Sequence, residues 1–286
     1  MAGTVRAGSR LAADRVRRMF RSRGWGFQRL AESHAGSVAG DTLVAIALAG
    51  TLFFQVPTAE ARENVALYLL ITLAPFAVIG PFLGRVYERY PSAYRGGLVV
   101  SSVGRAVVCV VMAIWLDTFL LFPFAFLLLV LSRFHGISRS SLLPVVLESR
   151  RDLVSANAQL ARIGVVAAAV IVPIGAFGVW QFGPWFALLL AAITFMGSAL
   201  AATRLPAIDL AAMAHAAEVD EQGQERLLIT PRSVRLARFA TAGVRFLNGF
   251  LLLIVAFAFR TEDAGILDFS AFLAAGGLGY YAAAFF

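Results

Sequence analysis

The stretch VALYLLITLAPFAVIGPFLG, residues Val65–Gly84, contains no charged side chain and is long enough to cross a lipid bilayer as a helix. Such a span takes about 20 apolar residues at about 1.5 Å of rise each. Because lipid offers the backbone no hydrogen-bond partner, the peptide groups must pair within the segment, which favours an α-helix. The sequence therefore predicts a membrane-spanning helix here.

The composition extends this prediction to the whole chain. Hydrophobic residues make up 59% of the 286 residues and charged residues only 15%, with a mean hydropathy of +0.78. A soluble domain of this size carries more charge on its surface. We therefore predict an all-α, polytopic membrane protein with hydrophobic segments at Val38–Val56, Val65–Leu83, Gly97–Leu116, Phe119–Leu147, Ala156–Val179, Pro184–Ala202, Phe239–Phe259 and Phe269–Phe286.

The net charge of +8 comes from arginine, since the chain has no lysine. The arginines cluster beside hydrophobic segments, which favours the membrane surface over nucleic acid as the partner. They recur in alternate loops, on the side of the basic arm at residues 1–34. Positive loops face the cytoplasm, so we expect a multi-pass protein of the inner (plasma) membrane with a cytoplasmic N-terminus. The arm is either a simple basic flank or an amphipathic helix on anionic lipid.

One long polar stretch divides the hydrophobic segments into six and two. Residues 206–232 contain most of the later acidic residues, and we interpret them as a cytoplasmic linker. The chain then consists of the basic arm (1–34), a six-helix bundle (35–205), the linker (206–232) and a partial second bundle of two spans (233–286). A short repeat supports this division, because Arg29-Leu30-Ala31 precedes the first segment and Arg235-Leu236-Ala237 the seventh.

Charged residues within the hydrophobic segments are the candidates for function, because a charge in lipid is costly. They are Asp41, Arg105, Arg133, Arg162 and Arg245. An interior network of such groups can bind an anion, relay a proton or lock helices together. Asp41, Arg162 and Arg245 are also close enough to the ends of their segments to pair at the membrane surface instead.

Signs of catalysis are absent from the sequence pattern. The three histidines are far apart, and neither a Ser-His-Asp order nor paired carboxylates within the segments occurs. The spacing of histidine, cysteine and acidic residues fits no metal site. We therefore expect no enzymatic activity, no metal and no cofactor.

Several motifs resemble those of the major facilitator superfamily. Gly84-Arg85-Val86-Tyr87-Glu88-Arg89 ends the second segment and is similar to the family's signature loop, with Glu88 in place of aspartate and Pro91 where glycine is common. The resemblance implies that Gly84, Glu88 and Arg89 form a gate loop that latches the two bundles. Arg133-Phe134-His135-Gly136 resembles the family's fourth-helix motif, in which the arginine is linked to proton-coupled transport.

Two further motifs lie in the fifth segment. Leu153–Ala158, which contains Asn157, resembles the start of the fifth helix in bacterial drug and siderophore exporters. Pro173-Ile174-Gly175-Ala176 is similar to the antiporter motif, with Val172 replacing its first glycine, and Pro173 with Gly175 implies a helix bend. The implied polar network for transport is Asp41, Arg105, Arg133, Asn157 and Arg245.

The resemblance implies a fold and a function together. The fold is a six-helix N-terminal bundle of major-facilitator type followed by the first two helices of a second bundle. The expected function is proton-coupled export of a small amphipathic compound by alternating access, with membrane lipids, the substrate and protons as partners. Because the family has twelve spans and the chain ends within its eighth segment, we expect a truncated transporter. The alternative is a non-transporting membrane scaffold or partner subunit.

Overall fold

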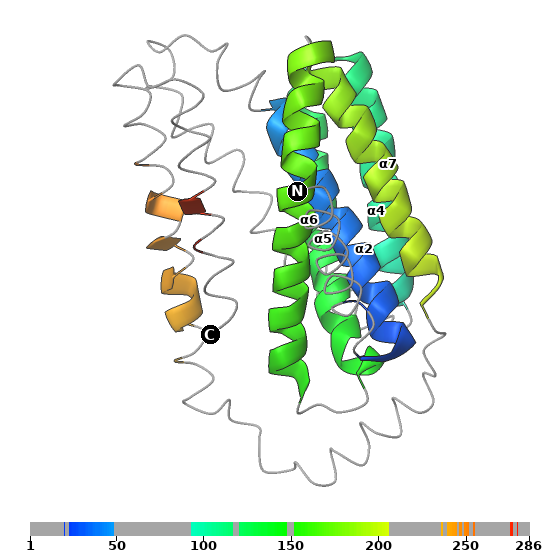
Figure 1. The fold of residues 1–286 in the computed structure, drawn as a ribbon, viewed down its shortest axis with the longest axis vertical. Helices are drawn as coiled ribbons and strands as arrows, with labels where there is room; N and C mark the ends of the chain where they lie inside the picture. Colours follow the sequence, from blue (N-terminus) through cyan, green and yellow to red (C-terminus); the bar gives the residue numbers. More distant parts are fainter. Residues whose placement is uncertain are drawn as a thin grey trace, which may run out of the picture. The chain divides into compact units, whose positions relative to one another are not determined.

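The computed structural model describes residues 20, 23–48, 93–116, 120–147 and 152–205, with short helical pieces between 236 and 279, of which 239–244 is the longest. No strand occurs in these ranges, so the all-α prediction is confirmed for them. The chain divides into two compact units, Met1–Ile208 and Asp209–Phe286. The first unit contains the helices α2 (Gly24–Leu48), α4 (Ala93–Ile114), α5 (Leu121–Val146), α6 (Leu153–Phe182) and α7 (Pro184–Thr203) (Figure 1).

The tight turn between α6 and α7 shows how the local sequence sets the helix ends. Gly183 has a φ of 96°, a left-handed conformation that glycine adopts without strain, and its N–H donates to the carbonyl of Val179 over 2.8 Å. Pro184 then starts α7, where its missing N–H costs nothing because the first helical N–H groups have no partner within the helix. Glycine and proline together therefore end one helix and begin the next.

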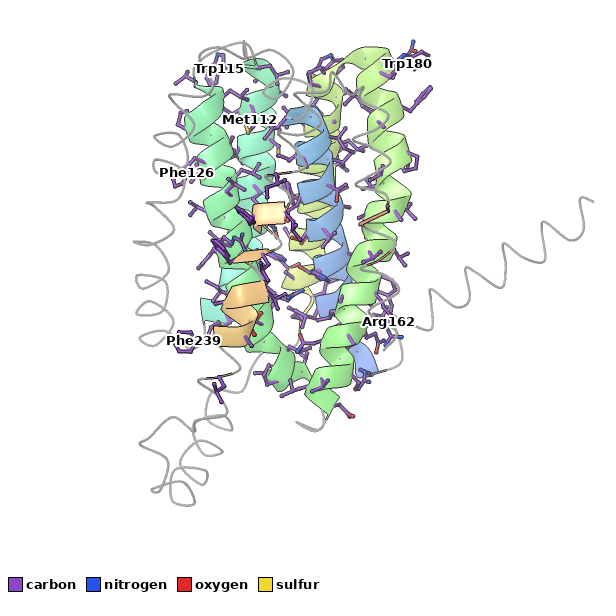
Figure 2. The ribbon with its side chains drawn as sticks, turned by 90° about the vertical axis from the view of Figure 1, so that its left-hand side faces the viewer. Met112, Trp115, Phe126, Arg162, Trp180 and Phe239 are labelled. Carbon is purple, nitrogen blue, oxygen red and sulfur yellow. The ribbon has the colours of Figure 1, made fainter. Side chains whose placement is uncertain are left out.

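The contacts between helix ends establish an up-and-down arrangement. Arg23, just before α2, bonds to Ser155 and Gln159 in the first turns of α6. Arg95 at the start of α4 donates to the carbonyl oxygen of Thr203 at the end of α7. Helices α2, α4 and α6 therefore begin at the end of the bundle where α7 finishes, and this end, which we call the arginine end, lies opposite Trp115 and Trp180 in Figure 2.

Helices α2 and α7 share the centre of the packing, since each contacts three of the other described helices. Helix α2 contacts α5, α6 and α7, while α4 packs between α5 and α7. Gly40 on α2 allows α2 and α7 to pack closely together, since a Cβ at this position would lie 2.4 Å from Cε1 of Phe195 on α7. Around this contact a cluster of buried side chains joins α2, α4, α5 and α7, including Leu43, Ala106, Met112, Leu128, Leu188 and Phe195.

The described part of the chain buries several charged and polar side chains within its apolar core and exposes many large apolar ones. Arg105 and His135 are buried, whereas Phe177 and Trp180 on α6 are mostly exposed. Three helices, Tyr94–Ile114, Leu153–Phe182 and Pro184–Thr203, are long and apolar enough to cross a membrane. Lipid is the solvent that suits such an exposed surface, so these helices indicate membrane association.

The first described helix differs from its predicted boundary. α2 begins at Gly24 rather than near Val38, and so takes up part of the predicted basic arm. Its first turns are amphipathic: Phe27, Leu30 and Ala31 are buried against α5 and α6, while Arg29 and Glu32 form an ion pair of 2.6 Å. The predicted segment Val65–Leu83 lies outside the described residues, as do part of Phe239–Phe259 and most of Phe269–Phe286.

Candidate functional site: an interior polar network

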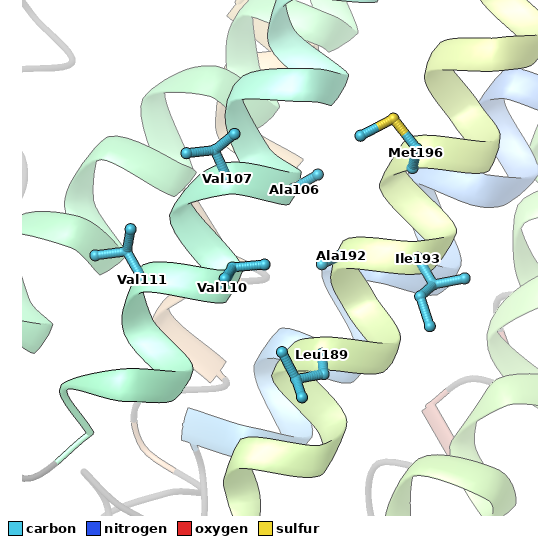
Figure 3. Close-up of a pocket in the computed structure, with 8 residues that line it drawn as sticks. All are labelled: Ala106, Val107, Val110, Val111, Leu189, Ala192, Ile193 and Met196. Atoms are coloured by element: carbon cyan, nitrogen blue, oxygen red, sulfur yellow. The ribbon is translucent and has the colours of Figure 1, made fainter.

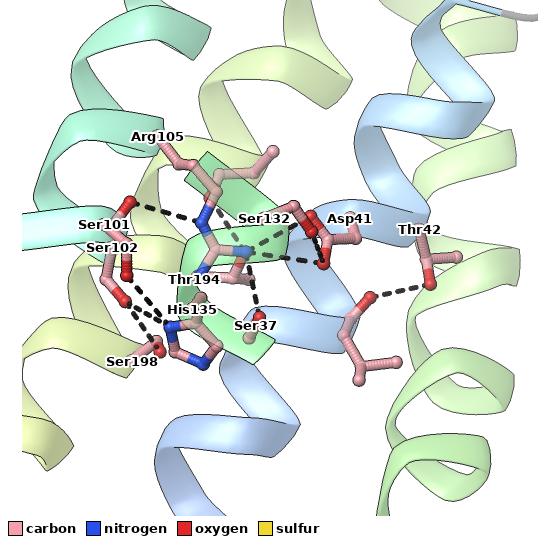
Figure 4. A network of polar contacts seen from close by, with 12 residues as sticks. Ser37, Asp41, Thr42, Ser101, Ser102, Arg105, Ser132, His135, Thr194 and Ser198 are labelled. Carbon is pink, nitrogen blue, oxygen red and sulfur yellow. Dashed lines mark hydrogen bonds and ion pairs between the residues drawn. The ribbon is translucent and has the colours of Figure 1, made fainter. Parts of the chain in front are cut away.

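Arg105 is the central residue of a polar network inside the bundle (Figure 4). Its side chain is completely buried on α4. From α2, Ser37 accepts a hydrogen bond from Nη1 over 2.9 Å, and the Asp41 carboxylate accepts from the same nitrogen over 3.3 and 3.4 Å. The guanidinium is therefore held by two positions one helical turn apart.

Two further helices complete the surroundings of this pair. Ser132 on α5 donates its hydroxyl to Asp41 Oδ2 over 3.1 Å. The ring of Phe195 on α7 lies 4.3 Å from the Arg105 guanidinium carbon, which is a cation–π distance. Because the pair and its neighbours come from α2, α4, α5 and α7, any rearrangement among these helices changes the environment of the charge.

The two members of the ion pair differ in access. The Arg105 side chain has no exposed surface, whereas 36% of the Asp41 side chain is exposed. A proton or another molecule that enters from outside the bundle therefore meets the carboxylate first. Arg105 Nη2 is buried and makes no hydrogen bond, so the guanidinium is only partly satisfied in this arrangement.

A second set of polar contacts continues from this pair towards the arginine end. Nδ1 of His135 on α5 lies 3.3 Å from the hydroxyls of both Ser101 and Ser102 on α4. Ser102 Oγ is 3.2 Å from Ser198 Oγ on α7, which donates to the Ser33 carbonyl over 2.7 Å. These hydroxyls can donate or accept, so the set can reorganise its hydrogen bonds without losing them.

The arginine end carries its own contacts between helices. Arg139 Nη1 on α5 lies 3.1 Å from Nδ1 of His34 on α2. Arg23 Nε donates to Gln159 over 2.9 Å, and its Nη1 is 3.7 Å from Asp152. A partly exposed ion pair such as Arg23–Asp152 is worth about 0–1 kcal/mol, so it orients α2 and α6 more than it stabilises them.

The structure brings together some of the residues predicted for the polar network. Asp41 and Arg105 form the ion pair, and Arg133 lies on the exposed side of α5, next to Ser132 in the chain. Asn157 is exposed near the start of α6 and is not among the residues that contact Arg105. Arg245 lies outside the described residues, as do the predicted gate-loop residues Gly84, Glu88 and Arg89.

The predicted bend in the fifth segment falls within a single continuous helix. α6 passes through Pro173 and extends to Phe182. Gly175 is buried against α2, and a Cβ there would lie 2.6 Å from Cδ2 of Leu43. Gly175 therefore allows close packing between α6 and α2 through its small size, and the bend at Pro173 stays a prediction.

Sequence reasoning did not identify the neutral partners in the network. Ser37, Ser132 and Phe195 are common residue types in hydrophobic helices, and nothing marks them individually. A weak signal existed for Ser37 alone, because Ser33, Ser37 and Asp41 recur every four residues and so share one face of α2. Ser101 and Arg105 have the same spacing on α4.

A separate groove lies on the outer side of the bundle between α4 and α7 (Figure 3). It has a volume of about 550 Å³, and its lining is apolar, formed by Ala106, Val107, Val110, Val111, Leu189, Ala192, Ile193 and Met196. A specific small-molecule site combines apolar walls with a few polar groups that fix orientation. The lining of this groove offers no such side chain, so the interior network is the stronger candidate site.

Comparison with known proteins finds relatives in mycobacteria. The uncharacterized protein ML2143 of Mycobacterium leprae (strain TN) is 34% identical over 179 residues, which cover 55% of this chain and 31% of that protein. The uncharacterized protein Rv0876c of Mycobacterium tuberculosis (strain ATCC 25618 / H37Rv) is 33% identical over 190 residues, covering 57% of this chain and 34% of its own length.

The chain therefore spans about a third of the length of the curated relatives it matches. No family model matches the chain, and no solved structure matches it.

Proposed function

We propose that this chain belongs to a transmembrane transporter that moves small molecules by alternating access. One observation carries the proposal: a fully buried arginine, Arg105, is paired with Asp41 across two helices of an apolar bundle. Ionisable groups inside membrane helices are costly, and an interior one is by default a candidate for a substrate, ion or proton pathway. The motifs in Gly84–Arg89 and Arg133–Gly136 favour a transporter of the major facilitator type.

The ion pair also provides a mechanism for coupling. A buried pair of this kind contributes little net stability, because desolvation offsets the attraction between the charges. A proton on Asp41 removes the charge that holds Arg105 Nη1, and the guanidinium then favours a different arrangement of α2, α4, α5 and α7. Proton binding and helix rearrangement are therefore linked, as proton-coupled export of an amphipathic compound requires.

The arrangement in the membrane follows the charge distribution. The proposal places the arginine end at the cytoplasmic surface of the inner (plasma) membrane, with the N-terminus on the same side. In this proposal α2, the predicted segment Val65–Leu83 and α4–α7 form the N-terminal six-helix bundle, and residues 233–286 contribute two helices of a second bundle. Reporter fusions that located Arg85–Arg95 outside the cell would contradict this topology.

Transport is tested by removing the charge of Asp41 without changing its size. The full chain is expressed in bacteria, and inverted membrane vesicles are energised in the presence of amphipathic fluorescent dyes of either charge. We expect Asp41→Asn to reduce protonophore-sensitive dye accumulation by at least tenfold, because asparagine cannot exchange a proton. Asp152→Asn is the matched control, since Asp152 lies at the exposed rim and is 54% exposed.

The alternative, a non-transporting membrane scaffold or partner subunit, gives a different result. In that case no dye accumulates, and Asp41→Asn alters only the stability of the protein. A Glu88→Ala variant separates the two functions again, because loss of a gate latch reduces transport at unchanged expression but leaves a scaffold unaffected.

A further inference from the structure

The four tryptophans of the chain all lie at the ends of described helices. Trp25 is at the start of α2, at the arginine end. Trp115 directly follows α4, and its N–H still donates to the carbonyl of Val111. Trp180 lies two residues before the end of α6, and Trp185 is the second residue of α7. Trp115, Trp180 and Trp185, which we call the tryptophan layer, share the end opposite the arginine end (Figure 2).

Each of the three membrane-length helices combines one residue of this layer with an arginine nearer to its other end. The arginine and the tryptophan are 18–20 residues apart: Arg95 and Trp115 for α4, Arg162 and Trp180 for α6, and Trp185 and Arg204 for α7. At about 1.5 Å of rise per residue these separations are about 27–30 Å, which matches the roughly 30 Å thickness of the hydrocarbon core of a bilayer. Helices that run in both directions therefore give the same spacing.

The stretches between these arginines and tryptophans contain almost no charge. Residues 163–179 of α6 and 186–203 of α7 have no charged side chain, and residues 96–114 of α4 have one, Arg105. The first turns of α6 are more polar, since Ser155, Asn157 and Gln159 precede Arg162. The apolar zone of α6 therefore starts at Arg162, well inside the helix.

The contacts of the arginines fit the edge of a hydrocarbon core. Arg162 Nε donates to the carbonyl of Ala158, one turn nearer to the arginine end, so the side chain is directed away from the apolar zone. Arg95 donates to the carbonyl oxygen of Thr203, which puts the arginine positions of α4 and α7 at one level. Basic side chains at the end of a span extend in this way towards the membrane surface, and tryptophan is enriched at both interfaces.

From this spacing we propose that the bundle contacts the two interfaces of a phospholipid bilayer through Arg95, Arg162 and Arg204 on one side and the tryptophan layer on the other. The three arginines lie at the level of the phosphates of one leaflet, whose charge complements theirs. The three indole rings lie at the headgroup boundary of the opposite leaflet. This inference is independent of transport, because a membrane scaffold would need the same two interfaces.

The same spacing places the Asp41–Arg105 pair at the middle of the bilayer. Arg105 is 10 residues from each end of the α4 stretch, which corresponds to about 15 Å from each interface. Phe195, whose ring lies 4.3 Å from the Arg105 guanidinium carbon, is 10 residues from Trp185 and 9 from Arg204. Two helices that run in opposite directions therefore agree on this depth, and a proton that reaches the pair from either surface crosses half of the hydrocarbon core.

Tryptophan fluorescence tests this depth, because bromine quenches it only at close range. The purified full chain is reconstituted into vesicles of phosphatidylcholine that is brominated either near the headgroup or near the ends of the acyl chains. Because every tryptophan lies at a helix end, we expect the shallow bromines to quench the unaltered chain about twofold more than the deep ones. This first measurement needs no variant.

A scan with single tryptophans then locates the two interfaces and the middle. Each variant keeps one tryptophan, and the others are replaced by phenylalanine. We expect the shallow bromines to be the stronger quencher for native Trp185 and for Arg204→Trp, at the two ends of α7. The deep bromines should be the stronger quencher for Ile193→Trp, which is 8 residues from Trp185, and for Val172→Trp, which is 10 residues from Arg162 on α6.

Each contrary result overturns a stated part of the proposal. Stronger quenching of Trp185 by deep bromines than by shallow ones moves the interface away from the start of α7, and shallow quenching of both Ile193→Trp and Val172→Trp removes the ion pair from the middle of the bilayer. If aqueous iodide quenches the unaltered chain and neither lipid does, the tryptophan layer faces water. If no quencher acts, protein covers the layer. Protection of buried Cys109 from a maleimide dye shows that each variant is folded.

Discussion

At Asp41 and Arg105 the two halves of one ion pair have different access to solvent, and this difference predicts an asymmetry in stability. Removing Asp41 leaves the fully buried Arg105 without its counter-charge, whereas removing Arg105 leaves a carboxylate that keeps 36% of its surface exposed. Breaking a buried pair costs about 3–5 kcal/mol. We expect Asp41→Leu to destabilise the protein by about this amount and Arg105→Met by clearly less, measured by thermal unfolding in detergent with the Cys109 maleimide reaction as the signal.

The double variant Asp41→Leu, Arg105→Met is the control for this asymmetry. Replacing both charges by apolar residues removes the desolvation cost together with the attraction, and such replacements are often neutral or stabilising. The double variant should therefore recover most of the stability lost in Asp41→Leu. Equal losses in both single variants, with no recovery in the double variant, would show that the pair is not the origin of the effect.

The sequence indicated the charged residues of the site but not their neutral neighbours. Asp41 and Arg105 stand out because a charge within a hydrophobic segment is rare. Ser132 and Phe195 do not stand out, since serine and phenylalanine are ordinary in such segments. Their roles depend on the rotation of α5 and α7 about their own axes, which is set by packing among several helices and not by either sequence alone.

At the scale of helices, the approach of α2 to α7 depends on Gly40. A Cβ at this position would lie within 2.4–2.7 Å of three ring atoms of Phe195, whose ring also stacks on Arg105. We expect Gly40→Ala to destabilise the bundle by about 1–3 kcal/mol, the usual cost of overpacking, even though alanine favours helix more than glycine does. The thermal unfolding assay with Cys109 measures this loss.

Gly197 on α7 provides a matched control. An added Cβ there would meet nothing within 4 Å, so Gly197→Ala should leave stability unchanged or raise it by up to about 1 kcal/mol through helix propensity. If both alanine variants behaved alike, close packing of α2 on Phe195 would be contradicted and helix propensity alone would explain the data.

The helix boundaries illustrate what a hydrophobic pattern can and cannot predict. The predicted sixth segment began at Pro184, where α7 begins, because Gly183-Pro184 is an unambiguous turn signal. The start of α2 was placed too late, since Arg29, Glu32 and His34 made the region before Val38 look like a polar arm. Those residues are interleaved at helical spacing with Phe27 and Leu30, which are buried. This amphipathic pattern indicates a helix only when α5 and α6 are present to cover its apolar side.

At the scale of the whole molecule, the contacts of the polar network all lie within the first compact unit, Met1–Ile208. Among the described residues, the contacts that hold Arg105 and those between α2 and α6 are made by residues of the first unit. We therefore expect a chain ending at Ile208 to insert into membranes and fold. Its unfolding temperature should lie within about 3 °C of that of the full chain, which corresponds to about 1 kcal/mol for a protein of this size.

Cys109 again supplies the measurement, because it is the only cysteine of the chain and lies next to the network on α4. Its thiol should resist a maleimide dye in the shortened chain as it does in the full one. Ready labelling at room temperature would mean that α4 needs the second unit for its packing, and the interior network would then belong to the whole chain. Protection would instead make the first unit an independent folding module, in which the Asp41–Arg105 pair forms before a second bundle is present.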